Sequence, residues 1–197
     1  MRILIATGIF PPDIGGPATY GEIMANALTK QGFNVQVITY SSNKTNRQTT
    51  YKLNKVSRRW PKGLRHFIYF CRLFLLVRKS DVVLALNAVS AGRSASFWAK
   101  VFKKRFIVRI VGDYAWEMAV AKGKTSLLID DFQKVAKRGF LHSVQVKTCK
   151  NADKIIVPSF YLKKIVTGWG INESKINVVY NAVDFKKSGL SKEEARK

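Results

Sequence analysis

Acidic side chains are scarce in this sequence, where 12 Asp and Glu residues stand against 35 Lys and Arg and give a formal net charge of +23 at pH 7. The deficit is deepest between Glu22 and Asp81, an interval without a single carboxylate. A surplus of this size indicates a polyanionic partner, which nucleic acid, an anionic membrane surface or phosphorylated substrates would each satisfy. Charge alone does not choose among these three.

Other scarcities exclude further classes. The two cysteines, Cys71 and Cys149, belong to no disulfide or metal motif, so we expect both to be buried thiols. The two histidines, His66 and His142, are isolated, and no metal site is expected. The chain has no run of ~18 uncharged apolar residues and no signal-peptide pattern, so we expect a cytoplasmic protein.

The 197 residues, 47% of them apolar, can bury a substantial core. Short apolar runs alternate with amphipathic stretches, which predicts an α/β fold with a doubly wound, mostly parallel Rossmann-like sheet flanked by helices. Strands are expected at 1–6, 33–40, 81–86, 106–111, 152–157 and 176–180, with a less regular edge strand within 51–61. Helices are expected at 18–30, 63–79, 90–102 and 161–167, and two more within 114–150, broken near Gly123.

The loop after the first strand has the composition of a ligand loop. Two prolines end the strand, and Gly15-Gly16 allows the backbone to adopt positive φ and to approach a ligand closely. Pro17 suits the first position of a helix, whose free N–H groups favour phosphate or carboxylate. The same residues also fit a plain turn followed by a helix start.

In a doubly wound sheet, ligands bind beyond the carboxyl ends of the strands. Polar residues follow several strands here: Asn87, Gly112-Asp113 and Asn181. Asp113 is the carboxylate in the middle of this edge, and the rings of Tyr114 and Trp116 could stack on a sugar or base. A functional carboxylate and a helix N-cap are both open interpretations of Asp113.

Four segments together resemble a known family. MRILIATGIFPPDIGGPATY, DVVLALNAVSAG, VRIVGDYAWE and ADKIIVPSFYLKKIVTGWGINESKINVVYNAVD are similar to the amino-terminal domain of family-four retaining glycosyltransferases. The resemblance implies a Rossmann-like acceptor domain over 1–184, one half of a GT-B architecture. Residues 185–197 would then be the interdomain linker and the start of a C-terminal donor domain that this chain lacks.

The resemblance also implies a function: transfer of a sugar, of hexosyltransferase type, from a nucleotide-sugar donor to a lipid-linked or saccharide acceptor. Gly15 and Gly16 would reach the donor phosphates, and Asp113 would orient the acceptor hydroxyl or take its proton, although many members have a histidine just after this strand. Residues 181–184 match the family's interdomain hinge. We also expect Tyr20, Asn87, Arg109, Tyr114, Trp116 and Asn181 to contact substrate. No cofactor or metal is expected, and this chain alone should be inactive.

The basic surplus suggests a second surface. Arg65, Arg72 and Lys79 recur at seven-residue spacing on one predicted helix that also carries Phe67, Phe70 and Phe74. Such a helix suits anionic lipid, and the expected membrane-surface residues are Arg58, Arg59, Lys62, Arg65, Arg72 and Lys79. The protein would then lie at the inner face of the membrane. A core helix with a solvated basic ridge fits the same pattern.

Two other functions explain less. A non-catalytic basic module that binds membrane or nucleic acid accounts for the charge but not for the polar strand ends, and no nucleic-acid-binding motif occurs, so we expect no nucleic acid partner. Nicotinamide-dependent reduction is disfavoured because the first loop lacks G-x-G-x-x-G and the second strand ends without an acidic residue.

Overall fold

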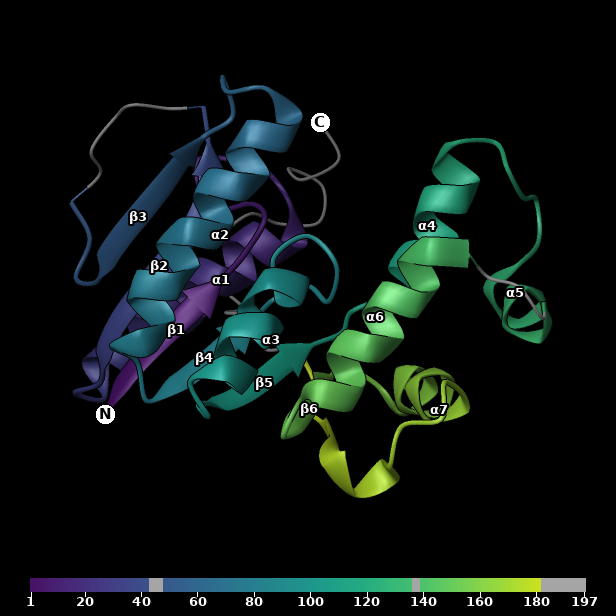
Figure 1. Ribbon diagram of the computed structural model, residues 1–197. Coiled ribbons are helices and arrows are strands. Elements are labelled where there is room, and N and C mark those ends of the chain that lie inside the picture. Colours follow the sequence, from purple (N-terminus) through teal and green to yellow (C-terminus); the bar gives the residue numbers. More distant parts are fainter. Residues whose placement is uncertain (43–47, 136–138, 182–197) are drawn as a thin grey trace, which may run out of the picture.

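Seven parallel strands form the centre of the computed structural model, which describes residues 1–42, 48–135 and 139–181. The strand order is β3-β2-β1-β4-β5-β6-β7, with every pairing parallel. The chain therefore winds outward from β1 to β3 and then crosses back to β4, which confirms the doubly wound prediction (Figure 1). The strands are β1 (Arg2–Ala6), β2 (Asn34–Ser41), β3 (Lys52–Ser57), β4 (Val82–Ala85), β5 (Arg105–Arg109), β6 (Lys154–Val157) and β7 (Ile176–Val178).

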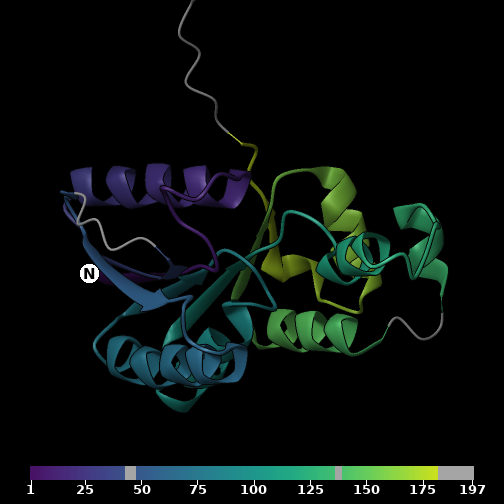
Figure 2. The same cartoon turned by 90° about the horizontal axis from the view of Figure 1, so that it is seen from above.

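Helices cover both faces of the sheet. Figure 2 shows α1 over one face and α2 and α3 side by side over the other. The helices are α1 (Gly16–Lys30), α2 (Lys62–Arg78), α3 (Gly92–Val101), α4 (Tyr114–Ala121), α5 (Ile129–Lys134), α6 (Gly139–Asn151) and α7 (Phe160–Gly168), with a 3-10 turn at Glu173–Lys175. This arrangement leaves the carboxyl ends of the strands as the edge where loops gather.

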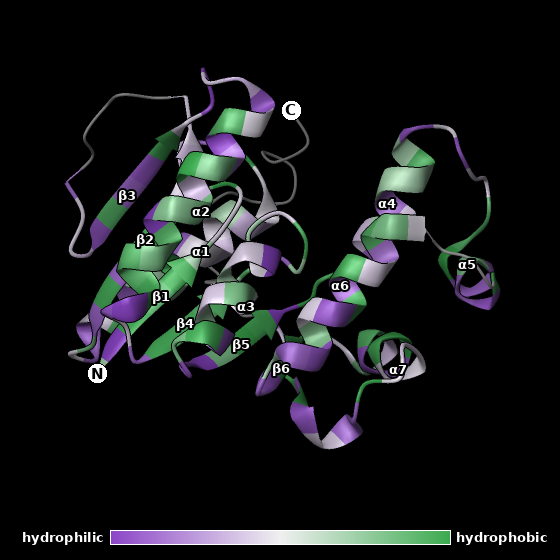
Figure 3. Cartoon of the chain, viewed as in Figure 1, coloured by the Kyte–Doolittle hydropathy of each residue, from purple (hydrophilic) through white to green (hydrophobic). Residues whose placement is uncertain are grey.

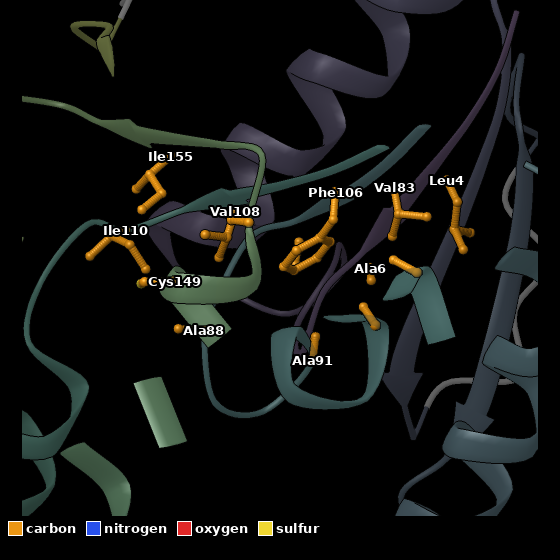
Figure 4. Close-up of a cluster of buried hydrophobic side chains, with 14 of the residues drawn as sticks. Leu4, Ala6, Val83, Ala88, Ala91, Phe106, Val108, Ile110, Cys149 and Ile155 are labelled. Carbon is orange, nitrogen blue, oxygen red and sulfur yellow. The ribbon is translucent and has the colours of Figure 1, made fainter. Parts of the chain in front are cut away.

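The two-residue period of the strands divides the core into two layers. Leu4 and Ala6 of β1 face the layer that α2 and α3 cover, whereas Ile3 and Ile5 face the layer under α1. Figure 4 shows part of the first layer, where Phe106 of β5 lies among side chains from neighbouring elements. Small residues on the inner side of α3 (Ala91, Ala95 and Ala99, all fully buried) let that helix approach the sheet closely.

Most of the predicted elements are confirmed, and two expectations need correction. The segment 114–150 contains three helices rather than two, because Gly139 at φ +80° begins a separate helix, α6, beyond the break at Gly123. Cys149 is buried as expected, but Cys71 is exposed because it lies on the side of α2 opposite the buried Tyr69 and Leu73. The irregular 51–61 segment does contain an edge strand, β3, paired with β2.

The hinge expected at 181–184 lies, apart from Asn181, outside the described residues, as does the linker 185–197. Among the residues that the structure describes, no helix is long and apolar enough to cross a membrane. The same residues contain no cluster of three or more His, Cys, Asp or Glu side chains that could hold a metal ion.

Candidate functional site

The loop after β1 begins the site at the carboxyl edge of the sheet. Gly15 has φ +153° and is the N-cap residue of α1, with its carbonyl accepting hydrogen bonds from the N–H groups of Ala18 and Thr19. A side chain at Gly15 would be strained by this backbone, and its Cβ would lie 3.1 Å from a methyl carbon of Ile9. The predicted glycine conformation at the start of α1 is therefore present.

Arg58 holds this loop in place from the end of β3. Its Nη1 donates to Asp13 Oδ1 at 3.0 Å, its Nη2 donates to Asp13 Oδ2 at 2.6 Å, and Nη2 also reaches the Gly8 carbonyl at 3.2 Å. A two-point guanidinium–carboxylate pair fixes orientation as well as distance. This pairing counts against the expectation that Arg58 faces a membrane, because the Asp13 carboxylate and the Gly8 carbonyl occupy its guanidinium.

A buried arginine contacts two other parts of the chain at the same edge. Arg109, at the end of β5, is 3% exposed, and its guanidinium carbon lies 3.6 Å from the centre of the Tyr20 ring of α1. Its Nη2 donates to the side-chain oxygen of Asn181, just beyond β7. Burial lowers the pKa of Arg109, and Tyr20 opposes this shift. Tyr20, Arg109 and Asn181, all predicted to bind substrate, are thus brought together.

The Nε of Arg109 is buried without a hydrogen-bond partner among the described residues. A guanidinium loses much of its hydration in such a place, so each N–H that remains unpaired is costly and is suited to an incoming acceptor oxygen. Arg109 also lines a small pocket, together with Asn87, Tyr114 and Glu117. Among the described residues, Arg109 is therefore a buried cation beside this pocket that keeps one hydrogen-bond donor without a partner.

Glu117 is a residue of this pocket that the sequence did not single out. Partial burial raises the pKa of its carboxyl, and the charge of nearby Asp113 raises it further. Its side chain folds back over Gly112, where an added Cβ would collide with Oε1. The available signal was its spacing: Glu117 follows Asp113 by four residues, which places both on one side of α4.

Asp113 is fully buried, and its carboxylate accepts four hydrogen bonds. Oδ1 accepts from the N–H groups of Ala115 (3.0 Å) and Trp116 (3.2 Å) and from Gln145 Nε2 (2.7 Å), and Oδ2 accepts from Gln133 Nε2 (2.8 Å). The helix N-cap interpretation is confirmed. The catalytic role stays a prediction. This geometry counts against it, because both carboxylate oxygens of Asp113 already accept hydrogen bonds from the protein.

The remaining predicted residues divide between pocket and scaffold. Asn87 and Tyr114 line the pocket, and the Asn87 side-chain oxygen also accepts from the N–H groups of Val89 (2.7 Å) and Ser90 (2.9 Å). Trp116 does not line it, because its ring N–H donates 2.9 Å to the Leu127 carbonyl. Gly16 is the first residue of α1, and the first turn of that helix lies next to the pocket at the same edge of the sheet.

Comparison with known proteins places this geometry in context. The family model for Glycosyltransferase Family 4 matches residues 14–187. A comparison with curated protein sequences found no match. Among solved structures, HepE from Anabaena in complex with UDP superposes with a TM-score of 0.65 at 14% identity, covering 93% of this chain and 45% of HepE.

Two further structures show how widely the fold is shared. The lipopolysaccharide outer core galactosyltransferase WaaB has a TM-score of 0.61 at 16% identity, covering 95% of this chain and 47% of WaaB. UDP-GlcNAc 2-epimerase from Methanocaldococcus jannaschii, in complex with UDP-GlcNAc and UDP, has a TM-score of 0.60 at 17% identity, covering 91% of this chain and 46% of the epimerase. The chain spans less than half the length of each of these three structures. At such identities the likeness establishes the fold.

Proposed function

This chain belongs to glycosyltransferase family 4, and we propose that it is the acceptor-binding half of an enzyme that moves a sugar from a nucleotide-sugar to a saccharide or lipid-linked acceptor, with retention. The fold alone supports less than this, because its structural neighbours include both a galactosyltransferase and an epimerase. Family membership favours transfer over epimerisation. Residues 1–184 would form this half, and a donor-binding half would complete the enzyme.

The start of α1 is the part of this half that would meet the donor. The complexes of HepE with UDP-glucose and of the epimerase with UDP-GlcNAc support a nucleotide-sugar as the ligand class. In our proposal the N–H groups at the start of α1, beside Gly15 and Gly16, approach the donor phosphates, because a helix N-terminus stabilises negative charge. Such stabilisation of the leaving diphosphate would operate without a metal ion.

The observation that carries the proposal is the pocket that contains both Arg109 and Glu117. The Arg109 guanidinium is held by Tyr20 and Asn181 and keeps an unpaired N–H, so it can fix an acceptor oxygen in place. Glu117 supplies a carboxylate with a raised pKa, suited to accept the proton of an acceptor hydroxyl in a hydrogen bond. We therefore assign to Glu117 the acceptor-facing role that the sequence suggested for Asp113.

The test is a transfer assay on the protein that carries this chain together with a donor-binding half, with a panel of UDP- and GDP-sugars as donors. We expect one donor to release nucleoside diphosphate in an acceptor-dependent way, and Glu117→Gln to lower kcat by about a hundredfold. Glu173→Gln is the matched control, because Glu173 is an exposed carboxylate paired with Lys163 on the far side of α7. Turnover by Glu117→Gln at the parental rate would refute the assignment.

A further inference from the structure

The outer side of α2 is apolar, although it faces away from the sheet. Leu64, Phe67 and Leu75 are 41%, 63% and 58% exposed, while Tyr69, Leu73 and Val77 on the opposite side are fully buried. Figure 3, in which the outer side of α2 faces the viewer, shows hydrophobic turns alternating with hydrophilic ones along the helix. An amphipathic helix packed on a sheet normally presents a polar outer side. The exposed apolar residues of α2, which we call the apolar crest, therefore indicate a surface that binds a partner.

The crest continues onto α3. Phe97 and Val101 are 50% and 52% exposed on the outer side of that helix. The Phe97 ring lies 5.4 Å from the ring of Phe70 on α2, so the two helices form one continuous surface rather than two separate patches. Phe70 itself is partly buried against Trp98, at 4.7 Å between ring centres, and takes no part in the exposed crest.

The charge around this crest is predominantly positive, although Asp153 lies beside Lys100, Lys103 and Lys104 at the end of α3. Within residues 59–104 the sole acidic residue is Asp81, and its carboxylate is paired with Arg2 at 2.8 Å. We define the α2–α3 face as the exposed apolar residues Leu64, Phe67, Leu75, Phe97 and Val101 with the basic residues around them. These basic residues are Arg59, Lys62, Arg65, Arg78, Lys79, Arg93, Lys100, Lys103 and Lys104.

We propose that the α2–α3 face docks on the surface of an anionic lipid bilayer, with its apolar crest entering the headgroup region and its basic residues contacting lipid phosphates. Both the basic residues and the exposed apolar residues are needed to identify this partner. Lysine and arginine alone would equally suit nucleic acid, but phosphate backbones offer nothing to exposed Leu64 or Phe67. An apolar crest alone would suit a protein, whereas the predominantly positive residues around it match a negatively charged lipid surface.

This face differs from the one that the sequence predicted. Arg58 is removed from it by its pairing with Asp13, and Arg72 donates a hydrogen bond to the Lys55 carbonyl, which ties it to β3. Phe74 is partly buried against Trp98, at 5.0 Å between ring centres. In exchange, α3 and the residues after it contribute to the face. The proposal goes beyond the transferase function and does not rest on it, because lipid binding needs neither donor nor acceptor.

The experiment is co-sedimentation of the chain with vesicles of phosphatidylcholine, and with vesicles of phosphatidylcholine and phosphatidylglycerol in equal parts. We expect binding only to the anionic vesicles, and a loss of binding at 1 M salt, where the screening length falls to about 3 Å. The triple variant Arg78→Gln, Lys79→Gln, Lys100→Gln should bind about a hundredfold more weakly, at about 1 kcal/mol per basic residue. The double variant Phe67→Ser, Leu75→Ser should bind about tenfold more weakly or worse.

The matched control is Lys30→Gln, Lys122→Gln, Lys164→Gln, which removes the same charge from exposed positions on α1, after α4 and on α7. It should keep parental binding within about threefold, since these positions lie outside the face. Circular dichroism checks that the variants are folded. Equal binding to neutral vesicles, or equal losses in the control, would overturn the proposal. So would binding to single-stranded RNA that the Phe67 and Leu75 substitutions leave unchanged, together with no vesicle binding.

Discussion

Replacing Asp113 with alanine separates its two interpretations, because a helix cap and a catalytic base fail in different ways. Alanine removes the N-cap acceptor of α4, which costs about 1 kcal/mol in comparable caps. It also leaves two side-chain amides, Gln133 Nε2 and Gln145 Nε2, without the carboxylate they now contact at 2.8 and 2.7 Å. A buried donor without a partner costs about 1–3 kcal/mol.

Gln145 Nε2 keeps one other contact, His142 Nδ1 at 3.3 Å, whereas Gln133 cannot compensate easily. Gln133 Oε1 already accepts from the ring N–H of Trp169 at 2.9 Å, so a flip of the Gln133 amide would break that bond. We therefore expect Asp113→Ala to lose roughly 3–5 kcal/mol of unfolding free energy. In a domain of this size that loss lowers the Tm by roughly 6–20 °C. Such a loss is a large part of a typical domain stability of about 5–15 kcal/mol.

The assay is urea and thermal unfolding followed by circular dichroism, with Ser159→Ala as control. Ser159 caps α7 by accepting from the Leu162 N–H at 3.2 Å and has no glutamine network, so its loss should be near 1 kcal/mol. Asp113→Asn should fall between the two, because its amide would place a donor against one of the glutamine donors. If Asp113→Ala unfolds within about 2 °C of the parent while transfer disappears, the cap argument fails and the catalytic interpretation stands.

Three further predictions concern the loop, the pocket and the thiols. Arg58→Gln should cost about 1–2 kcal/mol of unfolding free energy and speed amide hydrogen exchange around Asp13, measured by mass spectrometry, because the pair is largely shielded from solvent. Burial raises the pKa of Glu117 in the folded state, so its ionisation destabilises the fold as pH rises from about 4 toward neutral. Glu117→Gln should therefore gain stability over the parent in neutral but not in acidic unfolding measurements. Burial raises the pKa of the Cys149 thiol to about 12, so iodoacetamide should modify Cys71 and spare Cys149 in the native protein.

The fold was largely predictable from the sequence because its signals are local. Apolar runs at 1–6, 81–86 and 106–111 are the central strands β1, β4 and β5, and the helices between successive strands indicate crossovers that make the strands parallel. The segment 114–150 was predicted less well because α5 has only six residues, too few for a clear helical period. The exposure of Cys71 was missed since α2 is apolar almost all round, so its buried side could not be identified from periodicity.

The site was predictable in location but not in the roles of its residues. Strand ends identify the edge, and Tyr20, Arg109 and Asn181 do meet there. Roles depend on partners far along the chain, such as the glutamine that contacts Asp113 from 32 positions away. The Arg58–Asp13 pair spans 45 positions. No periodicity or spacing rule connects residues at such separations, so the sequence leaves a helix cap and a catalytic carboxylate both open for Asp113.

α2 connects the proposed membrane surface to the candidate site. Its outer side forms the crest of the α2–α3 face, while on its inner side the Tyr69 hydroxyl donates to the Thr7 carbonyl, at 3.3 Å, where β1 ends. Tyr69 is fully buried and stacks on Tyr40 of β2 at 4.5 Å, so this connection is rigid. Lipid docking through α2 would therefore fix the height of the glycine loop above the bilayer. An enzyme held in this way would act most readily on acceptors confined to the same surface, which favours the lipid-linked acceptor over a free saccharide.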